Sequence, residues 1–387
     1  MRLFPSRNYM NRIAIYIAVT AMTCVAFLAS CGGSHSGQTA TGGKPIEMRY
    51  SEHLTINEHE GYTEVTVRNP WDTVRTLQRY ILVPRDSVVP QNLPEGTMIR
   101  IPVDKALVYS TVHNGLIAEL GAIDAIGGVC NSEYINDSEI RKRIESGRII
   151  DCGISTAPDL ENIIKLRPQA ILLSPFENND KYAKVGELGI PIIECADYME
   201  TSPLGRAEWI RFYGLLFGVR ERSESLFAST EKEYLRLKEL AAGAKTKPKV
   251  IIDQRYGQVW NVPAGKSTMG RLIEDAGGVN PFSGFSQSGS VALAPEKVLG
   301  EAHDADIWFV RYNQETDKSM SELASDSPVN SRFKAYRDGN VYGCNTRYVN
   351  FYEETPFHPD RLLHDMITAM HPELEENGQL LYYHRLK

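Results

Sequence analysis

Residues 220–244 constrain the fold of this chain more than any other stretch, because they predict one long amphipathic helix. Four apolar residues recur along the stretch at spacings of seven, three and four positions: Phe227, Tyr234, Leu237 and Ala241. These spacings place them on one helical face, with charged residues between them. No Gly or Pro interrupts the stretch before Gly243, so at 1.5 Å per residue the helix is on the order of 36 Å long. Short apolar segments alternate with helical ones on both sides, which predicts two α/β lobes joined by a stiff helix.

Residues 1–30 have the pattern of a secretory signal. Three arginines precede an apolar run at 13–29, and the run ends in Leu-Ala-Ser before Cys31. This ending resembles a bacterial lipoprotein signal, whose cysteine is lipidated and becomes the mature N-terminus. An uncleaved membrane anchor is the alternative, although the run is short for a span. Residues 31–45 are rich in Gly, Ser and Thr and predict a flexible tether, so we expect a folded body held at a membrane by a lipid on Cys31.

Charge and cysteine content narrow the functional classes. The formal net charge is −7, and removal of the arginine-bearing leader makes the chain more acidic. Nucleic acid is therefore not an expected partner, because affinity for phosphates comes mostly from Lys and Arg. Four cysteines beyond the leader lack zinc-type spacing: Cys130, Cys152, Cys195 and Cys344. A Cys130–Cys152 bridge and buried free thiols both agree with the sequence.

Residues 46–103 predict a β-rich N-terminal segment. The stretches 62–67 and 77–83 have strand-like composition and flank an Asn-Pro-Trp-Asp turn at 69–72. The pattern indicates a hairpin or small sheet that precedes the first lobe.

The remainder predicts two doubly wound α/β lobes around the long helix. Residues 104–202 form lobe 1, residues 203–247 an interlobe helical region, and residues 248–387 lobe 2. Strands are expected at 105–109, 125–129, 170–173, 191–195, 249–253, 306–310 and 340–343. Helices are expected at 114–120, 159–166, 181–188, 267–276, 295–299 and 360–370.

Four segments carry a resemblance to a known family: 107–129, 158–173, 260–282 and 293–310. In order and spacing they resemble the substrate-binding proteins of bacterial ABC importers. The similarity is to the helix-strut class, class III of the periplasmic binding proteins, which carries ferric siderophores, haem and cobalamin. It covers residues 104–370 and leaves the β-rich segment outside.

The resemblance implies a ligand held between the lobes, at the carboxyl ends of the strands. The residues it implies are Thr111, His113, Tyr134, Phe176, Arg255, Tyr256, Trp260, Phe285, Arg311 and Tyr312. Aromatic side chains beside arginines suit a flat ligand with anionic groups. Core packing is the alternative for Tyr256 and Trp260, and helix capping or solvent exposure for His113. Three more aromatic residues are candidates for the same cleft, with a position outside it as the alternative: Tyr348, Phe351 and Tyr352.

Glu161 and Glu296 lie early in corresponding helices of the two lobes. An acidic residue in the first turn is expected from the helix dipole alone. The resemblance adds a second role, because the family uses one glutamate per lobe to meet arginines on the permease.

These observations predict a lipid-anchored protein that captures an iron chelate, a ferric siderophore or haem, and delivers it to an ABC permease. A corrinoid-binding protein of the same importer class is the alternative ligand hypothesis. A surface lipoprotein that passes its ligand to an outer-membrane receptor, and an adhesive protein, are alternatives of other classes. We expect a monomer in the periplasm of a bacterial envelope, with no cofactor beyond the Fe or Co of the ligand.

An enzyme is not expected from the motifs. Gly265-Lys266-Ser267 resembles the end of a P-loop, but Trp260 stands where that motif requires Gly. The sequence contains no Gly-x-Ser-x-Gly elbow and no His-Glu-x-x-His motif.

Overall fold

The computed structural model describes residues 43–177, 182–374 and 378–387. The leader, Cys31 and most of the expected tether lie outside the described residues. Within the described ranges, no helix is both long and apolar enough to cross a membrane.

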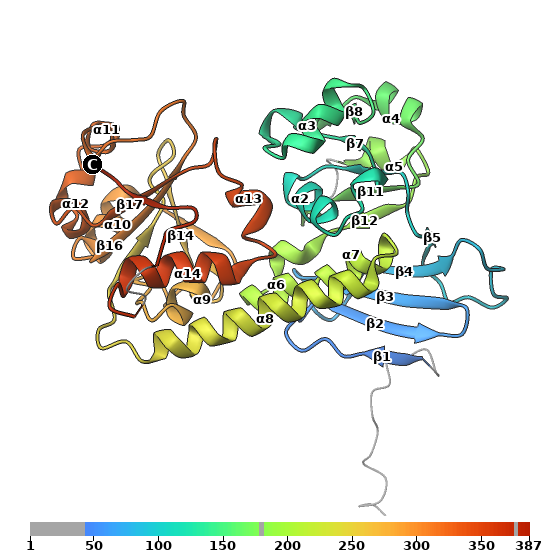
Figure 1. The fold of residues 1–387 in the computed structure, drawn as a ribbon, viewed down its shortest axis with the longest axis horizontal. Coiled ribbons are helices and arrows are strands. Elements are labelled where there is room, and N and C mark those ends of the chain that lie inside the picture. The colour runs from blue at the N-terminus through green and yellow to red at the C-terminus, as the bar shows by residue number, and fades with distance from the viewer. Residues whose placement is uncertain (1–42, 178–181, 375–377) are drawn as a thin grey trace, which may run out of the picture. The chain divides into compact units, whose positions relative to one another are not determined.

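The long helix is confirmed as α8 (Arg220–Ala242). Its C-terminal half packs into lobe 2, where Tyr234, Leu237 and Ala241 join the buried core. Its N-terminal half meets α7 (Ile210–Leu216) so closely that a Cβ at Gly214 would lie 1.9 Å from the Ser223 hydroxyl. Figure 1 shows α8 running alongside both lobes. One element is therefore anchored in both cores.

Lobe 1 is built on a parallel five-stranded sheet in the order β12-β11-β6-β7-β8. Its strands are β6 (Ala106–Val108), β7 (Ile126–Val129), β8 (Ile150–Asp151), β11 (Ala170–Leu173) and β12 (Ile192–Glu194). A short pair, β9 (Gly153–Ile154) and β10 (Ala157–Pro158), lies beside it. Its helices are α2 (Thr111–Glu119), α3 (Ser138–Glu145), α4 (Leu160–Leu166) and α5 (Ala183–Gly186). Aspartate side chains cap α3 and α4, which explains why each helix begins directly after an Asp.

Lobe 2 has a mixed sheet in the order β13-β16-β17-β18, in which only the β17–β18 pair is antiparallel. Its strands are β13 (Val250–Ile252), β16 (Ile307–Tyr312), β17 (Val341–Asn345) and β18 (His384–Arg385). A separate antiparallel pair consists of β14 (Trp260–Pro263) and β15 (Ser290–Leu293). Its helices are α9 (Thr268–Asp275), α10 (Pro295–Ala302), α11 (Met320–Asp326), α12 (Lys334–Arg337), α13 (Phe351–Glu354) and α14 (Pro359–Met370).

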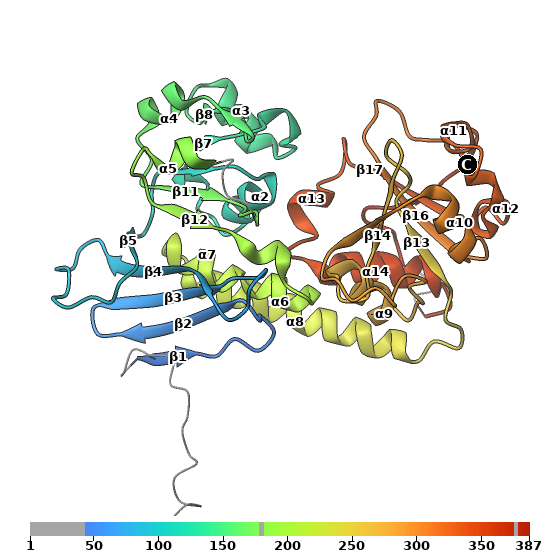
Figure 2. The same cartoon turned by 180° about the vertical axis from the view of Figure 1, so that it is seen from behind.

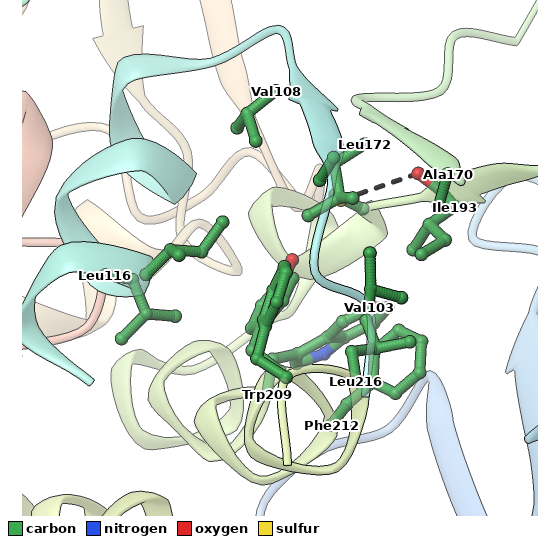
Figure 3. Close-up of a cluster of buried hydrophobic side chains, with 14 of the residues drawn as sticks. Val103, Val108, Leu116, Ala170, Leu172, Ile193, Trp209, Phe212 and Leu216 are labelled. Carbon is green, nitrogen blue, oxygen red and sulfur yellow. Dashed lines mark hydrogen bonds between the residues drawn. The ribbon is translucent and has the colours of Figure 1, made fainter. Parts of the chain in front are cut away.

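Both lobes bury alternate residues of each strand on opposite faces of the sheet. In lobe 1, Val108, Leu172 and Ile193 pack toward α2 and α7, around Trp209 and Phe212 (Figure 3). Their neighbours Leu107 and Ile171 belong to a second cluster on the other face. Because side chains alternate along a strand, a short apolar run such as 106–108 is covered on both sides. The predicted α/β class, with two lobes and one long connecting helix, is confirmed.

The N-terminal segment forms a five-stranded sheet in the order β1-β2-β3-β4-β5, antiparallel except for the β4–β5 pair. Its strands are β1 (Lys44–Ile46), β2 (Leu54–His59), β3 (Tyr62–Arg68), β4 (Thr76–Pro84) and β5 (Thr97–Ile101). Inward residues such as Ile56, Val65 and Tyr80 belong to the same buried cluster as residues of lobe 1 and α7. Figure 2 shows the sheet beside α7 and below lobe 1. The sheet therefore shares a hydrophobic core with lobe 1.

Buried carboxylates fix this sheet to α6 (Pro203–Glu208) and to the loop before it. Glu208 is fully buried and accepts hydrogen bonds from the backbone N–H groups of Arg49, Tyr50 and Ser51, at 2.8–2.9 Å. Glu200, also fully buried, accepts from the Trp209 indole N–H at 2.8 Å and from backbone N–H groups at 52 and 53. These carboxylates satisfy backbone donors of the segment between β1 and β2, which among the described residues has no strand partner to accept them.

We expect Glu208→Ala to lower the free energy of unfolding by about 3 kcal/mol, because three backbone N–H groups lose their fully buried acceptor. Urea unfolding measures this loss. Glu208→Gln retains one acceptor oxygen and should lose less, and exposed Glu239→Ala on α8 serves as the matched control. An unchanged unfolding midpoint in Glu208→Ala would show that the carboxylate does not hold the sheet.

Candidate ligand-binding cleft

A cavity of about 1320 Å³ lies between the two lobes. Residues after β6, β7 and β11 line it from lobe 1, and residues after β13, β16 and β17 line it from lobe 2. Parallel strands bring their carboxyl ends to one edge of a sheet, where open α/β proteins bind ligands. The volume exceeds the range usual for drug-sized ligands.

Eight aromatic side chains line the cavity. They are Tyr109, Tyr134, Phe176, Tyr182, Tyr256, Tyr312, Tyr348 and Tyr352. Tyr256 is 86% exposed and Tyr348 is 63% exposed, which is unusual for such large rings. Burial raises the pKa of Tyr312 to about 12 and also raises that of Tyr109, so both phenols are neutral donors at ordinary pH. The Tyr109 hydroxyl is buried at the cavity wall and has no hydrogen-bond partner among the described residues.

Arg311 lines the cavity, but its charge is already paired. Its Nε donates to Asp253 Oδ1 at 2.7 Å, and its second guanidinium nitrogen donates to Asp253 Oδ2. Burial by itself would lower the pKa of Arg311, but the Asp253 carboxylate outweighs it and raises the pKa. The guanidinium also lies 5.2 Å from the Phe351 ring centre and 5.6 Å from that of Tyr352. Arg311 therefore fixes the aromatic wall of lobe 2.

Two other arginines bring positive charge to the cavity from opposite lobes, and the carboxyl groups of Glu133 and Glu353 also line it. Arg141 extends from α3 of lobe 1, and Arg347 follows β17 of lobe 2. Both side chains are exposed, and neither forms an ion pair within the part of the chain that the structure describes. Their guanidinium groups are available to an anionic ligand.

Glu353 connects the two lobes at the cavity wall. It is buried, and its Oε1 accepts a hydrogen bond from the backbone N–H of Asn136 at 2.8 Å. The Asn136 side chain donates to the Thr346 carbonyl at 3.3 Å. Burial raises the pKa of Glu353, and its Oε2 has no partner among the described residues.

The structure brings six of the ten residues expected at the ligand site to this cavity. These are Thr111, Tyr134, Phe176, Tyr256, Arg311 and Tyr312. Arg255 lines an adjoining cavity in lobe 2. Of the additional aromatic candidates, Tyr348 and Tyr352 line the main cavity, whereas Phe351 is buried behind it.

Trp260 was expected to contact the ligand, and this expectation is corrected. Its side chain is fully buried in the core of lobe 2. It stacks on Trp308 at 5.7 Å, meets Phe333 edge-on at 5.6 Å, and donates its indole N–H to the Ile252 carbonyl at 2.9 Å. Its neighbour on β14, Asn261, is exposed and lines the adjoining cavity. Successive side chains of a strand face opposite sides, so the residue next to Trp260 is the one that faces a cavity.

His113 and Phe285 also lie away from the cavity. His113 is buried in α2, and its Nε2 lies 2.9 Å from Asp197 Oδ1. Burial by itself would lower the pKa of His113, but Cys195 and the Asp197 carboxylate outweigh it and raise the pKa to about 10. Phe285 is partly buried against the lobe 2 core. These two side chains therefore contribute to packing and charge pairing.

Arg141, Arg347, Glu353, Tyr109 and Tyr182 line the cavity but were not among the residues expected from sequence. The position of Tyr109 and Arg347 just after strands was a usable signal, because strand ends meet at the cleft. Arg141 lies within a helix, and no local pattern distinguishes it from other exposed arginines.

Neither the thiols nor the acidic and imidazole groups form a metal site in the described ranges. Cys130, Cys152, Cys195 and Cys344 are all free and buried. No group of three or more His, Cys, Asp or Glu side chains there is arranged to hold a metal ion.

A profile of the family described as "Periplasmic binding protein" matches residues 107–348, more than half of the chain. This chain belongs to that family. The match begins after β5, so the N-terminal sheet precedes it. Membership identifies this chain as a periplasmic binding protein, which is a binding protein rather than an enzyme.

Two lipoproteins of one archaeon are similar to this chain. An uncharacterized lipoprotein of Methanocaldococcus jannaschii is 29% identical over 318 residues, which cover 77% of this chain and 73% of the relative. A second lipoprotein of that archaeon is 23% identical over 354 residues, covering 88% and 87% of the two chains. Both homologues are named as lipoproteins, and both are archaeal.

Two solved structures share the fold of this binding protein. One belongs to an ABC-type Fe3+-hydroxamate transport system of Saccharomonospora viridis, with a TM-score of 0.56, 16% identity, and coverage of 70% of this chain and 94% of that one. The other is a periplasmic haem-binding protein of Pseudomonas aeruginosa, with a TM-score of 0.55, 16% identity, and coverage of 70% and 93%. At this identity the likeness shows the shared fold alone.

We expect Trp260→Ala to lower the free energy of unfolding by about 3–5 kcal/mol, because it removes a fully buried indole from an aromatic cluster. Thermal unfolding measures the loss, with Trp71→Ala, a partly exposed tryptophan in the β3–β4 loop, as the control. Unchanged stability together with weakened ligand binding would instead show that Trp260 contacts the ligand in the cleft.

Proposed function

We propose that this periplasmic binding protein captures an iron chelate, a ferric siderophore or haem, between its lobes and delivers it to an ABC permease. The observation that carries the proposal is the pair Arg141 and Arg347, two exposed cations from opposite lobes beside a cavity lined by aromatic rings. An anionic ligand between them neutralises both charges and contacts both lobes at once.

The chemistry of the lining supports a chelate. Neutral phenols and guanidinium groups donate hydrogen bonds to oxygen atoms, which suits the anionic oxygens of a chelator or the propionates of haem. Aromatic faces provide a large apolar area for rings. Such a ligand brings the metal with its own coordinating atoms, so the lining residues bind the chelate around the metal.

Comparison supports iron as the metal. Two of the similar structures are named for Fe3+-hydroxamate transport and for haem binding. A corrinoid is the alternative ligand class and is distinguished by the binding experiment below.

Membrane attachment through a lipid on Cys31 is part of the same proposal. The two archaeal relatives named as lipoproteins support the anchor. A monomer in the periplasm of a bacterium is proposed from the sequence alone.

We expect Arg141→Ala with Arg347→Ala to weaken binding of the chelate about a hundredfold, because each lost charge-assisted hydrogen bond weakens binding about tenfold. Isothermal titration calorimetry of the full chain against a ferric catecholate, a ferric hydroxamate, haem and cyanocobalamin measures this effect. The matched control is Arg148→Ala, an exposed arginine of lobe 1 outside the cavity. Binding only of cyanocobalamin would favour the corrinoid alternative, and binding of no chelate would overturn the proposal.

Glu161 and Glu296 are the proposed contacts with the permease. Each is exposed in the first turn of its helix, α4 in lobe 1 and α10 in lobe 2. Exposed carboxylates at matching places in both lobes can meet two basic patches of a permease, where they set the rate and register of docking.

We expect Glu161→Lys with Glu296→Lys to leave chelate affinity unchanged and to lower uptake into cells at least tenfold, because charge reversal repels a basic partner. Uptake of radiolabelled iron chelate by a strain that produces the variant measures the effect. Exposed Glu239→Lys on α8 is the control. Normal uptake by the double variant would remove the docking role.

A further inference from the structure

A second cavity of about 630 Å³ adjoins the main cleft and belongs entirely to lobe 2. Tyr256, Arg311, Tyr312, Asn313 and Tyr352 line both cavities, so the two spaces meet along these side chains. We call this second space the annex. It lies beyond the aromatic wall that Arg311 holds in place.

The annex is polar and carries excess positive charge. Three of its side chains are cationic (Arg255, Arg311 and Lys318) and two are acidic (Asp253 and Asp326). Arg311 pairs with Asp253, and Lys318 Nζ lies 2.8 Å from Asp326 Oδ2. The third cation, Arg255, keeps its charge available. Among the described residues, its guanidinium donates only to the main-chain carbonyls of Gly257 and Asp326. It forms no ion pair within the described part of the chain.

Hydrogen-bond donors outnumber their protein partners in this space. The Lys318 side chain is 93% buried, yet among the described residues only one acceptor, Asp326, bonds to its three ammonium protons. Arg255 has five N–H donors and uses two of them. Asn261 presents an exposed side-chain amide from β14.

We infer that the annex is a carboxylate-binding subsite, which takes an anionic arm of the chelate whose metal-bearing core occupies the main cleft. A carboxylate accepts the unused donors of Arg255 in a forked geometry and neutralises its charge. Asn261 and Lys318 supply further donors along the same wall. The inference rests on the proposed chelate-binding function, and it narrows the ligand to chelates with a free carboxylate.

Metal-free citrate is the probe, with its trimethyl ester as the uncharged counterpart. Calorimetry of the full chain at low ionic strength, where charge pairs are least screened, measures the affinity. The measurement is made in an Arg141→Ala, Arg347→Ala background, so that the free cations of the main cleft do not bind the probe. We expect citrate to bind this background and the trimethyl ester not to bind.

Two substitutions localise the binding. Arg255→Gln removes the unpaired cation, and Asn261→Asp adds a carboxylate of nearly the same shape, so each should weaken citrate binding about tenfold. Arg332→Gln, an exposed arginine of lobe 2 outside both cavities, should have no effect. Because Asn261→Asp is nearly isosteric, it keeps the test valid if Arg255→Gln disturbs the loop.

Equal citrate affinity in the background and in both annex variants would overturn the inference, as would no citrate binding at all. Neither result depends on whether a metal chelate binds the main cleft. Failure of the annex is therefore distinguishable from failure of the proposed function, which is measured with the iron chelates.

Discussion

Helix α2 of lobe 1 packs directly on α13 of lobe 2, and the geometry of the cleft depends on this contact. Gly115 lies inside α2, where glycine costs about 1 kcal/mol relative to alanine. A Cβ there would lie 3.1 Å from the Glu353 carbonyl oxygen, so the close approach of the other lobe accounts for the glycine. The Asn136–Glu353 hydrogen bond reinforces the same junction. At 2.7 Å, His358 of lobe 2 also meets Glu119 of lobe 1.

Some charged side chains at the cleft are paired within the protein, and others are available to a ligand. Arg311 stands at the centre of the lobe 2 wall, but Asp253 and two aromatic rings already engage its guanidinium. Arg141 and Arg347 have no acidic partner within the described ranges, and they come from different lobes. A buried charge must be paired, whereas an exposed one remains available to a ligand. The same distinction separates Lys318 from Arg255 in the annex.

The sequence predicted the region of the site better than its individual residues. Strand-end positions such as Thr111, Tyr134 and Phe176 reached the cavity, because the carboxyl ends of parallel strands must share one edge. Trp260 did not, because residue type suggested a ligand contact whereas strand alternation decides which side the residue faces. His113 comes just after the first strand of lobe 1, as expected. On α2, however, its side chain faces the core, where it pairs with Asp197.

Local periodicity by itself determined the long helix, the alternating strands and helices, and the two-lobed α/β class. These features repeat over a few residues and need no distant partner. The N-terminal sheet was predicted as β-rich, but only the tertiary structure decided that it shares a core with lobe 1 and is fixed by Glu200 and Glu208. Likewise, only the folded chain decided that Asp253 neutralises Arg311 while Arg141 and Arg347 have no acidic partner among the residues that the structure describes. Such pairings join residues tens to hundreds of positions apart, and no local spacing in the sequence specifies them.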